Sequence, residues 1–134
     1  MDSRLTYLLC VFLAAPAGAE EAPEWAHVDS GLIETSGLGP VRYVVGYSSV
    51  GYDHFLSEIV IAWNDGGERR QTIYEGIYDR PPATIRAEDG HLCVSMQVCP
   101  RGADRCRTDI LAYRYDSGAR RFRELEQGFA GCRR

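Results

Sequence analysis

The sequence predicts a small all-β domain, an antiparallel meander of about six to eight strands that forms a sandwich or a partly closed barrel and is stapled by disulfides. Short β-branched and aromatic runs recur along the chain, separated by turns rich in Gly and Asp. Apolar residues alternate strictly with smaller or polar ones from Leu92 to Cys99. No segment carries a convincing helical stripe. Residues 68–80 come closest, but Gly76 and the β-branched residues among them argue against a helix.

Residues 1–19 are expected to be a secretory signal peptide. Arg4 precedes an apolar run of about 11 residues, and Ala17-Gly18-Ala19 supplies small residues before Glu20. As a helix, this run is too short to cross the roughly 30 Å of bilayer hydrocarbon, although an uncleaved anchor is the alternative. We therefore expect cleavage between Ala19 and Glu20, and a periplasmic or extracellular mature chain without a membrane span.

Cleavage would leave four cysteines, Cys93, Cys99, Cys106 and Cys132, and an even number favours two disulfides in an exported chain. Cys93 and Cys99 lie roughly 20 Å apart on one extended strand, whereas a disulfide needs Cα atoms within about 7 Å. The intervening residues 100–105 would set Cys99 opposite Cys106. We therefore predict Cys99–Cys106, and Cys93–Cys132 as a tie between the tail and the sheet. A zinc site is the alternative, but the closely spaced cysteines typical of such sites are missing.

The strands follow one another along the mature chain. Residues 20–40 are expected to form an irregular lead-in with room for one strand, and residues 41–134 a single all-β domain. Asn64-Asp65-Gly66-Gly67 and Asp89-Gly90 provide the positive φ angles that tight hairpin turns need. The strands expected from the apolar runs and these turns cover residues 41–47, 59–63, 70–74, 84–88 and 91–99.

The last two hairpins are predicted residue by residue. A loop closed by Cys99–Cys106 pairs residue 98 with 107, 96 with 109, 94 with 111 and 92 with 113. This register places apolar residues of both strands on one face, and the tail bearing Cys132 could cover the other face. A turn over residues 116–119 would then place Tyr113 opposite Phe122.

Charge is distributed unevenly along the chain. The net charge is −4, yet residues 100–134 hold nine Arg and five acidic residues, whereas residues 20–99 hold five Arg and 13 acidic residues. The arginines on the last predicted hairpin could bind an anionic glycan or an acidic protein, or they could simply lie in solvent beside the acidic strands. Export, negative charge and the lack of a binding motif argue against nucleic acid. The candidate contact residues there are Arg114, Arg120, Arg121 and Arg123.

Aromatic residues provide a second candidate surface. A loop is predicted over residues 48–56, and Tyr47, Tyr52, His54 and Phe55 lie in it or beside it. Aromatic side chains on loops can anchor a protein or a sugar ligand, although core packing accounts for most of the aromatic residues in this half of the chain.

Catalytic signals are weak. Ser49, Asp53 and His54 offer a nucleophile, an orienting acid and a base, but neighbouring side chains on an extended segment point to opposite sides, so Asp53 cannot easily orient His54. No G-x-S-x-G motif accompanies them. The histidines lack the short spacing of metal ligands, so no metal or other cofactor is expected.

One turn has a limited resemblance to a known family. Ser117-Gly118-Ala119-Arg120 is similar to the Ser-Gly-x-x-Tyr loop of bacterial periplasmic lysozyme inhibitors, which are small exported β-barrels with disulfides. The resemblance implies an inhibitor function. It covers four residues, and Arg121 stands where the loop has Tyr, so it assigns no family.

The sequence therefore favours an exported, non-catalytic binding protein. Its expected partner is an envelope protein, as for an enzyme inhibitor, or an anionic envelope glycan. A small hydrolase using His54 with Asp53 or Ser49 is the first alternative, and a structural envelope subunit is the second.

Overall fold

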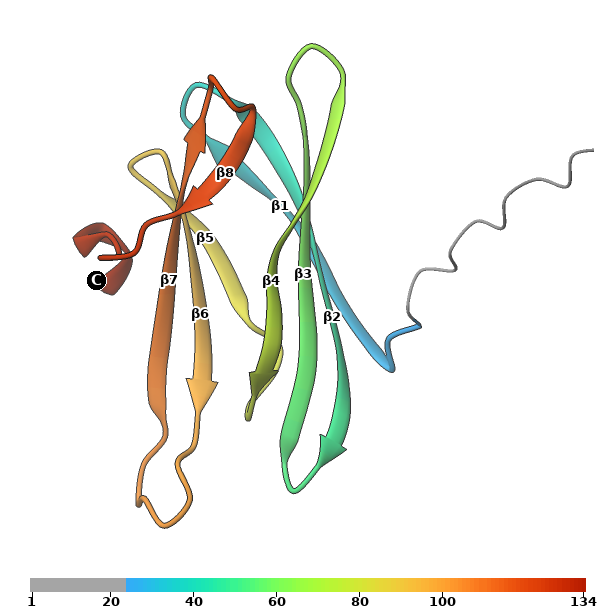
Figure 1. The fold of residues 1–134 in the computed structure, drawn as a ribbon, viewed down its shortest axis with the longest axis vertical. Coiled ribbons are helices and arrows are strands. Elements are labelled where there is room, and N and C mark those ends of the chain that lie inside the picture. Colours follow the sequence, from blue (N-terminus) through green and yellow to red (C-terminus); the bar gives the residue numbers. More distant parts are fainter. Residues whose placement is uncertain (1–23) are drawn as a thin grey trace, which may run out of the picture.

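The computed structural model describes residues 24–134, and the predicted signal peptide lies outside them. These residues form two four-stranded antiparallel sheets, packed face to face as a sandwich rather than closed into a barrel (Figure 1). This arrangement confirms the predicted all-β class. The first sheet contains β1 (His27–Thr35), β2 (Gly39–Gly51), β3 (His54–Asn64) and β4 (Glu68–Tyr78), and the second contains β5 (Thr84–Glu88), β6 (His91–Val98), β7 (Arg107–Asp116) and β8 (Arg121–Glu124).

The core lies between the two sheets. Alternate residues of each strand point inward, as the period of two requires. Burial of each large aliphatic side chain stabilises the fold by about 1.5–3 kcal/mol. The fully buried aliphatic residues are Val41, Val45, Ile59 and Ile61 from the first sheet and Leu92 and Val94 from the second. In the part of the chain that the structure describes, no helix is long and apolar enough to cross a membrane.

Both predicted disulfides are present. Cys99–Cys106 closes the β6–β7 loop with a Cα–Cα distance of 4.1 Å, and the Cα atoms of Cys93 and Cys132 lie 5.4 Å apart. The β6–β7 register is the predicted one throughout, from residue 98 opposite 107 to residue 92 opposite 113.

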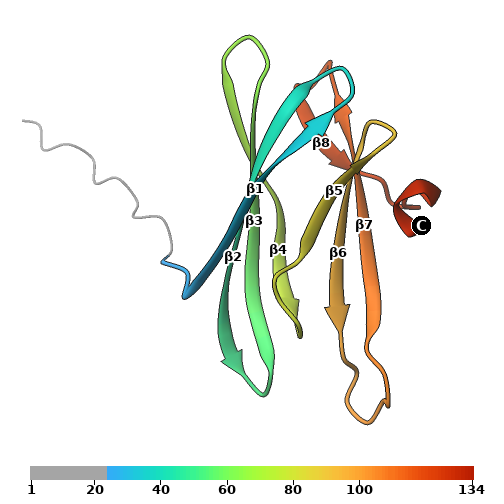
Figure 2. The same ribbon diagram turned by 180° about the vertical axis from the view of Figure 1, so that it is seen from behind.

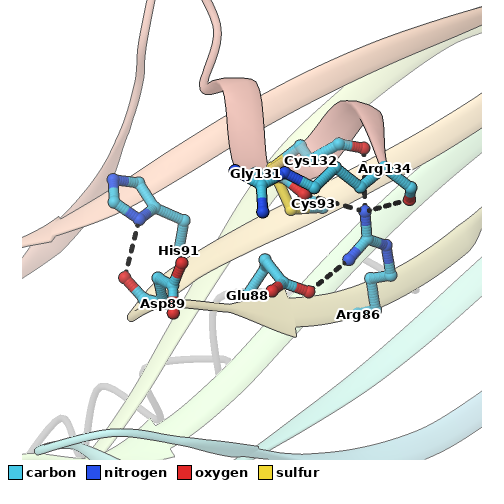
Figure 3. The surroundings of a disulfide bond; sticks show 8 residues. All are labelled: Arg86, Glu88, Asp89, His91, Cys93, Gly131, Cys132 and Arg134. Atoms are coloured by element: carbon cyan, nitrogen blue, oxygen red, sulfur yellow. Dashed lines mark hydrogen bonds and ion pairs between the residues drawn. A yellow bond between two sulfur atoms is a disulfide. The ribbon is translucent and has the colours of Figure 1, made fainter.

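The C-terminal tail covers the outer face of the second sheet, where a short 3-10 helix, η1 (Ala130–Arg133), lies beside β7 (Figure 2). Arg86 of β5 donates hydrogen bonds to the carbonyl oxygens of Gly131, Cys132 and Arg134 and pairs with Glu88 (Figure 3). These bonds satisfy carbonyl groups that the end of the short helix leaves without partners.

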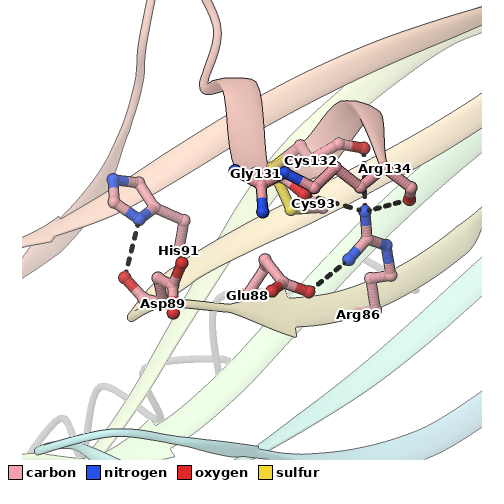
Figure 4. A network of polar contacts seen from close by, with 8 residues as sticks. All are labelled: Arg86, Glu88, Asp89, His91, Cys93, Gly131, Cys132 and Arg134. Atoms are coloured by element: carbon pink, nitrogen blue, oxygen red, sulfur yellow. Dashed lines mark hydrogen bonds and ion pairs between the residues drawn. A yellow bond between two sulfur atoms is a disulfide. The ribbon is translucent and has the colours of Figure 1, made fainter.

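His91 holds the same tail from the other side of the disulfide. Its ring stacks on Phe129 with centroids 3.8 Å apart. Its Nδ1 hydrogen-bonds to the carbonyl of Asp89, which fixes the ring beside the β5–β6 turn (Figure 4). The tail is therefore attached by a covalent bond, a guanidinium group and a stacked aromatic pair.

The predicted loop over residues 48–56 is wrong. β2 continues to Gly51 and β3 begins at His54, so only Tyr52 and Asp53 connect them. Both adopt positive φ angles, 53° and 61°, which close a tight turn of the type that usually contains Asn or Gly. The sequence hid this hairpin because neither residue is the usual one at its position.

The predicted register of β7 and β8 is also wrong. Phe122 lies opposite Tyr115, and Tyr113 lies opposite Glu124. The turn closes one residue later than predicted, because Arg120 takes a positive φ of 51°. Tyr113 and Tyr115 are two positions apart on one strand, so the same face still points to the core.

Two further elements differ in extent from the expectation. Within the expected lead-in, residues 27–35 form β1, an edge strand of the first sheet. β4 is longer than the predicted 70–74 and carries an irregularity where its register with β3 shifts between Ile59 and Val60. It is a strand throughout, as the rejection of a helix over residues 68–80 required.

Candidate functional site

The predicted contact residues lie at opposite ends of the sandwich. In a meander the turns alternate between the two ends, so the β2–β3 turn and the β7–β8 turn cannot meet (Figure 1). We call the end with the β2–β3 turn, the β4–β5 connection and the Cys99–Cys106 loop the disulfide end. The end with the β1–β2, β3–β4, β5–β6 and β7–β8 turns is the basic end. Each end has its own pocket.

The basic end contains a pocket of about 480 Å³ to which all four turns contribute. Both polar and apolar residues line it, and its size falls within the usual range for small-ligand sites. Two predicted arginines line it. The residues that line it include Ser36, Asp65, Arg114, Tyr115, Ser117 and Arg120.

The four predicted arginines differ in their partners. Arg123 donates from Nε to Asp116 at 2.7 Å, and the N–H of Ala119 together with Arg123 lowers the pKa of that carboxyl group. Arg114, Arg120 and Arg121 are exposed and form no ion pair with any residue from 24 to 134. Arg114 and Arg120 line the pocket, whereas Arg121 borders a neighbouring hollow over β8.

The acidic residue of this pocket is already bound. The hydroxyl of Tyr115 donates to the carboxylate of Asp65. Removal from solvent, and this hydrogen bond, raise the pKa of Tyr115, so the phenol remains protonated and keeps donating. Two arginines without an ion-pair partner among residues 24–134, against one carboxylate, leave the pocket with a local positive charge.

The disulfide end contains a second pocket of about 570 Å³, bordered by elements of both sheets. The β2–β3 turn, the segment after β4 and the disulfide loop each form part of its wall. Its lining residues are Tyr52, Asp53, His54, Phe55, Asp79, Arg80, Cys99, Ala103, Asp104, Arg105 and Cys106. Three of the predicted contact residues, Tyr52, His54 and Phe55, are therefore brought together.

Asp79 organises this pocket, and the sequence reasoning missed it. One carboxylate oxygen bonds Nδ1 of His54 and the other accepts the N–H of Cys99. The N–H of Asp79 donates to the carbonyl of Gln97 at 3.0 Å, so one residue links the end of β4 to the end of β6. Asp79 follows a strand directly and precedes Arg80 and two prolines, and this position at a strand end was the available signal.

The pair has a defined polarity. The N–H of Cys99, followed by His54, lowers the pKa of Asp79, so the carboxyl group is ionised and can only accept hydrogen bonds. Nδ1 of His54 must then carry the proton that it shares with Asp79, and Nε2 is the ring nitrogen left for a ligand. The side chain of His54 is 48% exposed, whereas that of Asp79 is only 9% exposed.

The residues predicted for a hydrolase are not the ones that are hydrogen-bonded to each other in the structure. Asp79, and not Asp53, is the acid that orients His54, because the carboxylate of Asp79 bonds Nδ1 of His54, whereas Asp53 lines the pocket without a hydrogen bond to that ring. Ser49 accepts the N–H of Gly51 at 3.4 Å and does not line the pocket. The described lining residues include no Ser, no Thr and no free thiol, so the oriented base lacks one of these nucleophiles beside it.

Tyr47 supports the disulfide end without lining its pocket. Its ring stacks on His27 with centroids 5.1 Å apart and meets Phe55 edge to face at 6.1 Å. Tyr52, in contrast, is 91% exposed. Within residues 24–134, no group of three or more His, Cys, Asp or Glu side chains could hold a metal ion.

Comparison with models of protein families, with curated proteins and with solved structures finds no match to this chain.

Proposed function

We propose that the protein is an exported, non-catalytic binding protein whose basic end recognises an anionic glycan of the cell envelope. The observation that carries this proposal is the pocket of the basic end, where Arg114 and Arg120 have no carboxylate partner among the described residues.

The chemistry of the pocket supports an acidic sugar as its ligand. A guanidinium group matches a carboxylate or sulfate with two parallel N–H donors, which makes it the most selective side chain for such groups. Ser36 and Ser117 offer hydroxyl groups that can donate to and accept from sugar hydroxyls. Asp65 keeps its negative charge, but the hydroxyl of Tyr115 occupies one of its oxygens, and the two lining arginines outnumber it.

Export is part of the same proposal. Residues 1–19 have the pattern of a signal peptide, and two disulfides hold the fold. Disulfides form and persist in oxidising compartments such as the periplasm and the extracellular space.

An acidic protein surface is the second candidate partner. Arg120 lies exposed on the β7–β8 turn, and Arg121, exposed at the start of β8, lies outside the pocket. Exposed arginines on this hairpin suit an acidic cleft, as an inhibitor of an enzyme with catalytic carboxylates would require. A structural subunit, in contrast, would purify from envelope extract in a fixed ratio with its neighbours.

Calorimetric titration with a trisaccharide of galacturonic acid tests the proposal. We expect binding that weakens with salt, and a loss of at least about 100-fold in affinity for the double variant R114Q/R120Q, because each charge-assisted contact contributes about tenfold or more. The matched control is R107Q, since Arg107 is exposed, pairs with Asp109 and lies on the β7 terminus at the opposite end. Absence of binding by the unsubstituted protein, or equal affinity of R114Q/R120Q, would contradict the proposal.

A further inference from the structure

We propose that the disulfide end is a second and separate binding site, and that its ligand is an uncharged saccharide. No residue lines both pockets, so the two ends can be occupied independently. The inference does not depend on the ligand proposed for the basic end.

The charges at the disulfide end favour a neutral ligand. Asp53 and Asp104 face the pocket together with Arg80 and Arg105, and none of the four has an ion pair or side-chain hydrogen bond with residues 24–134. The third carboxylate, that of Asp79, is bound by His54 and Cys99. The arginine pair would attract an anion and the aspartate pair would repel it, and the reverse would hold for a cation. A sugar hydroxyl both donates and accepts, so it can use both pairs.

Tyr52 provides the aromatic surface that a sugar ring needs. Its side chain is 91% exposed, and its backbone takes a positive φ of 53°, a conformation that is unfavourable for a residue with a large side chain. No ring partner within residues 24–134 offsets this strain. Exposed Tyr rings give a large and rigid contact area at low entropic cost, and strained exposed residues cluster at functional positions.

His54 is held in place before any ligand arrives. Asp79 fixes the ring through Nδ1, and Cys99, whose N–H holds Asp79, is itself fixed by the disulfide to Cys106. Nε2 is thus presented at a constant position for a hydrogen bond with a ligand hydroxyl. A site whose polar groups are already oriented loses less entropy on binding, which favours affinity for a weakly interacting ligand such as a sugar.

The test is a ¹H–¹⁵N titration of the purified, oxidised protein with an uncharged trisaccharide of N-acetylglucosamine. We expect shifts confined to residues 52–55, 79–80 and 103–106. Y52N should lower the affinity at least about tenfold and also raise the midpoint of thermal unfolding, because Asn tolerates this backbone conformation and the fold does not use the ring. Y52F, which keeps the ring, should bind within about twofold of the unsubstituted protein.

Each other outcome overturns the inference. No shift at millimolar trisaccharide, or unchanged affinity of Y52N, would show that the ring and the pocket do not form this site. Shifts of the same residues by glycine but not by the trisaccharide would assign a zwitterionic ligand instead. R114Q/R120Q should bind the neutral trisaccharide normally, so failure of this site and failure of the anionic site give different results.

Discussion

Replacing both cysteines of the Cys93–Cys132 disulfide by alanine is expected to cost more stability than replacing those of Cys99–Cys106. A disulfide stabilises a fold mainly by restricting the unfolded chain, and the restriction grows with the length of the closed loop. The two bridges span 39 and 7 residues, which corresponds to about 4 and about 2.4 kcal/mol at 25 °C. Cys93 and Cys132 are also buried, so C93A/C132A additionally loses packing in the small core under the tail.

Urea unfolding of the unsubstituted protein, C93A/C132A and C99A/C106A, followed by fluorescence of the buried Trp63, measures the difference. A domain of this size has a stability of about 5–15 kcal/mol, so both variants should fold while their midpoints separate. Equal losses, or a greater loss for C99A/C106A, would refute the argument from loop length. Dithiothreitol should lower the midpoint of the unsubstituted protein and leave that of a variant lacking Cys93, Cys99, Cys106 and Cys132 unchanged.

Three further predictions concern single side chains. The N–H of Cys99 lowers the pKa of Asp79 below its ordinary 3.8, so the carboxylate stabilises the fold above that pH and loses this effect as the pH falls through the pKa of the folded state. D79N should therefore reduce the dependence of the unfolding midpoint on acid pH. An unchanged pH profile would show that the hydrogen bonds of Asp79 do not stabilise the fold. Y52N should raise the free energy of unfolding by about 0.5–1 kcal/mol, measured in urea, and a lower value would show that the fold uses the Tyr52 ring. A Cβ atom at Gly46 would lie 2.2 Å from Cδ1 of Trp25, so G46A should displace that indole and lower the free energy of unfolding by about 1–3 kcal/mol. Unchanged Trp fluorescence and unchanged stability would exclude this contact.

The part of the fold that the sequence predicted best is the β6–β7 hairpin. Its alternation is strict, and the Cys99–Cys106 loop supplies a fixed point from which every pair can be counted. Where no such fixed point exists, as between β7 and β8, the predicted register was wrong. The β7–β8 turn closes through Arg120 in a left-handed conformation, and nothing in an Arg side chain signals that geometry.

The candidate sites were predicted only as separate groups of residues. His54 and Asp79 are 25 residues apart. They meet because His54 begins β3 and Asp79 directly follows β4, and these two positions lie at the same end of the first sheet. Such a contact depends on strand lengths, and β2, β3 and β4 are all longer than their apolar runs indicated. The sequence alone could have predicted that the aromatic and basic groups lie apart. Five strands lie between the β2–β3 and β7–β8 turns, and an odd number of strands places two turns of a meander at opposite ends.

A competition experiment tests most directly whether the molecule has two independent binding ends. The isotope-labelled protein is titrated with the acidic trisaccharide, then with the neutral one in the same sample, and the amide shifts are assigned. We expect the acidic ligand to move the signals of residues 114–120, and the neutral ligand to move those of residues 52–55 afterwards with undiminished affinity. A single set of shifts shared by both ligands, or no shift with either, would contradict it.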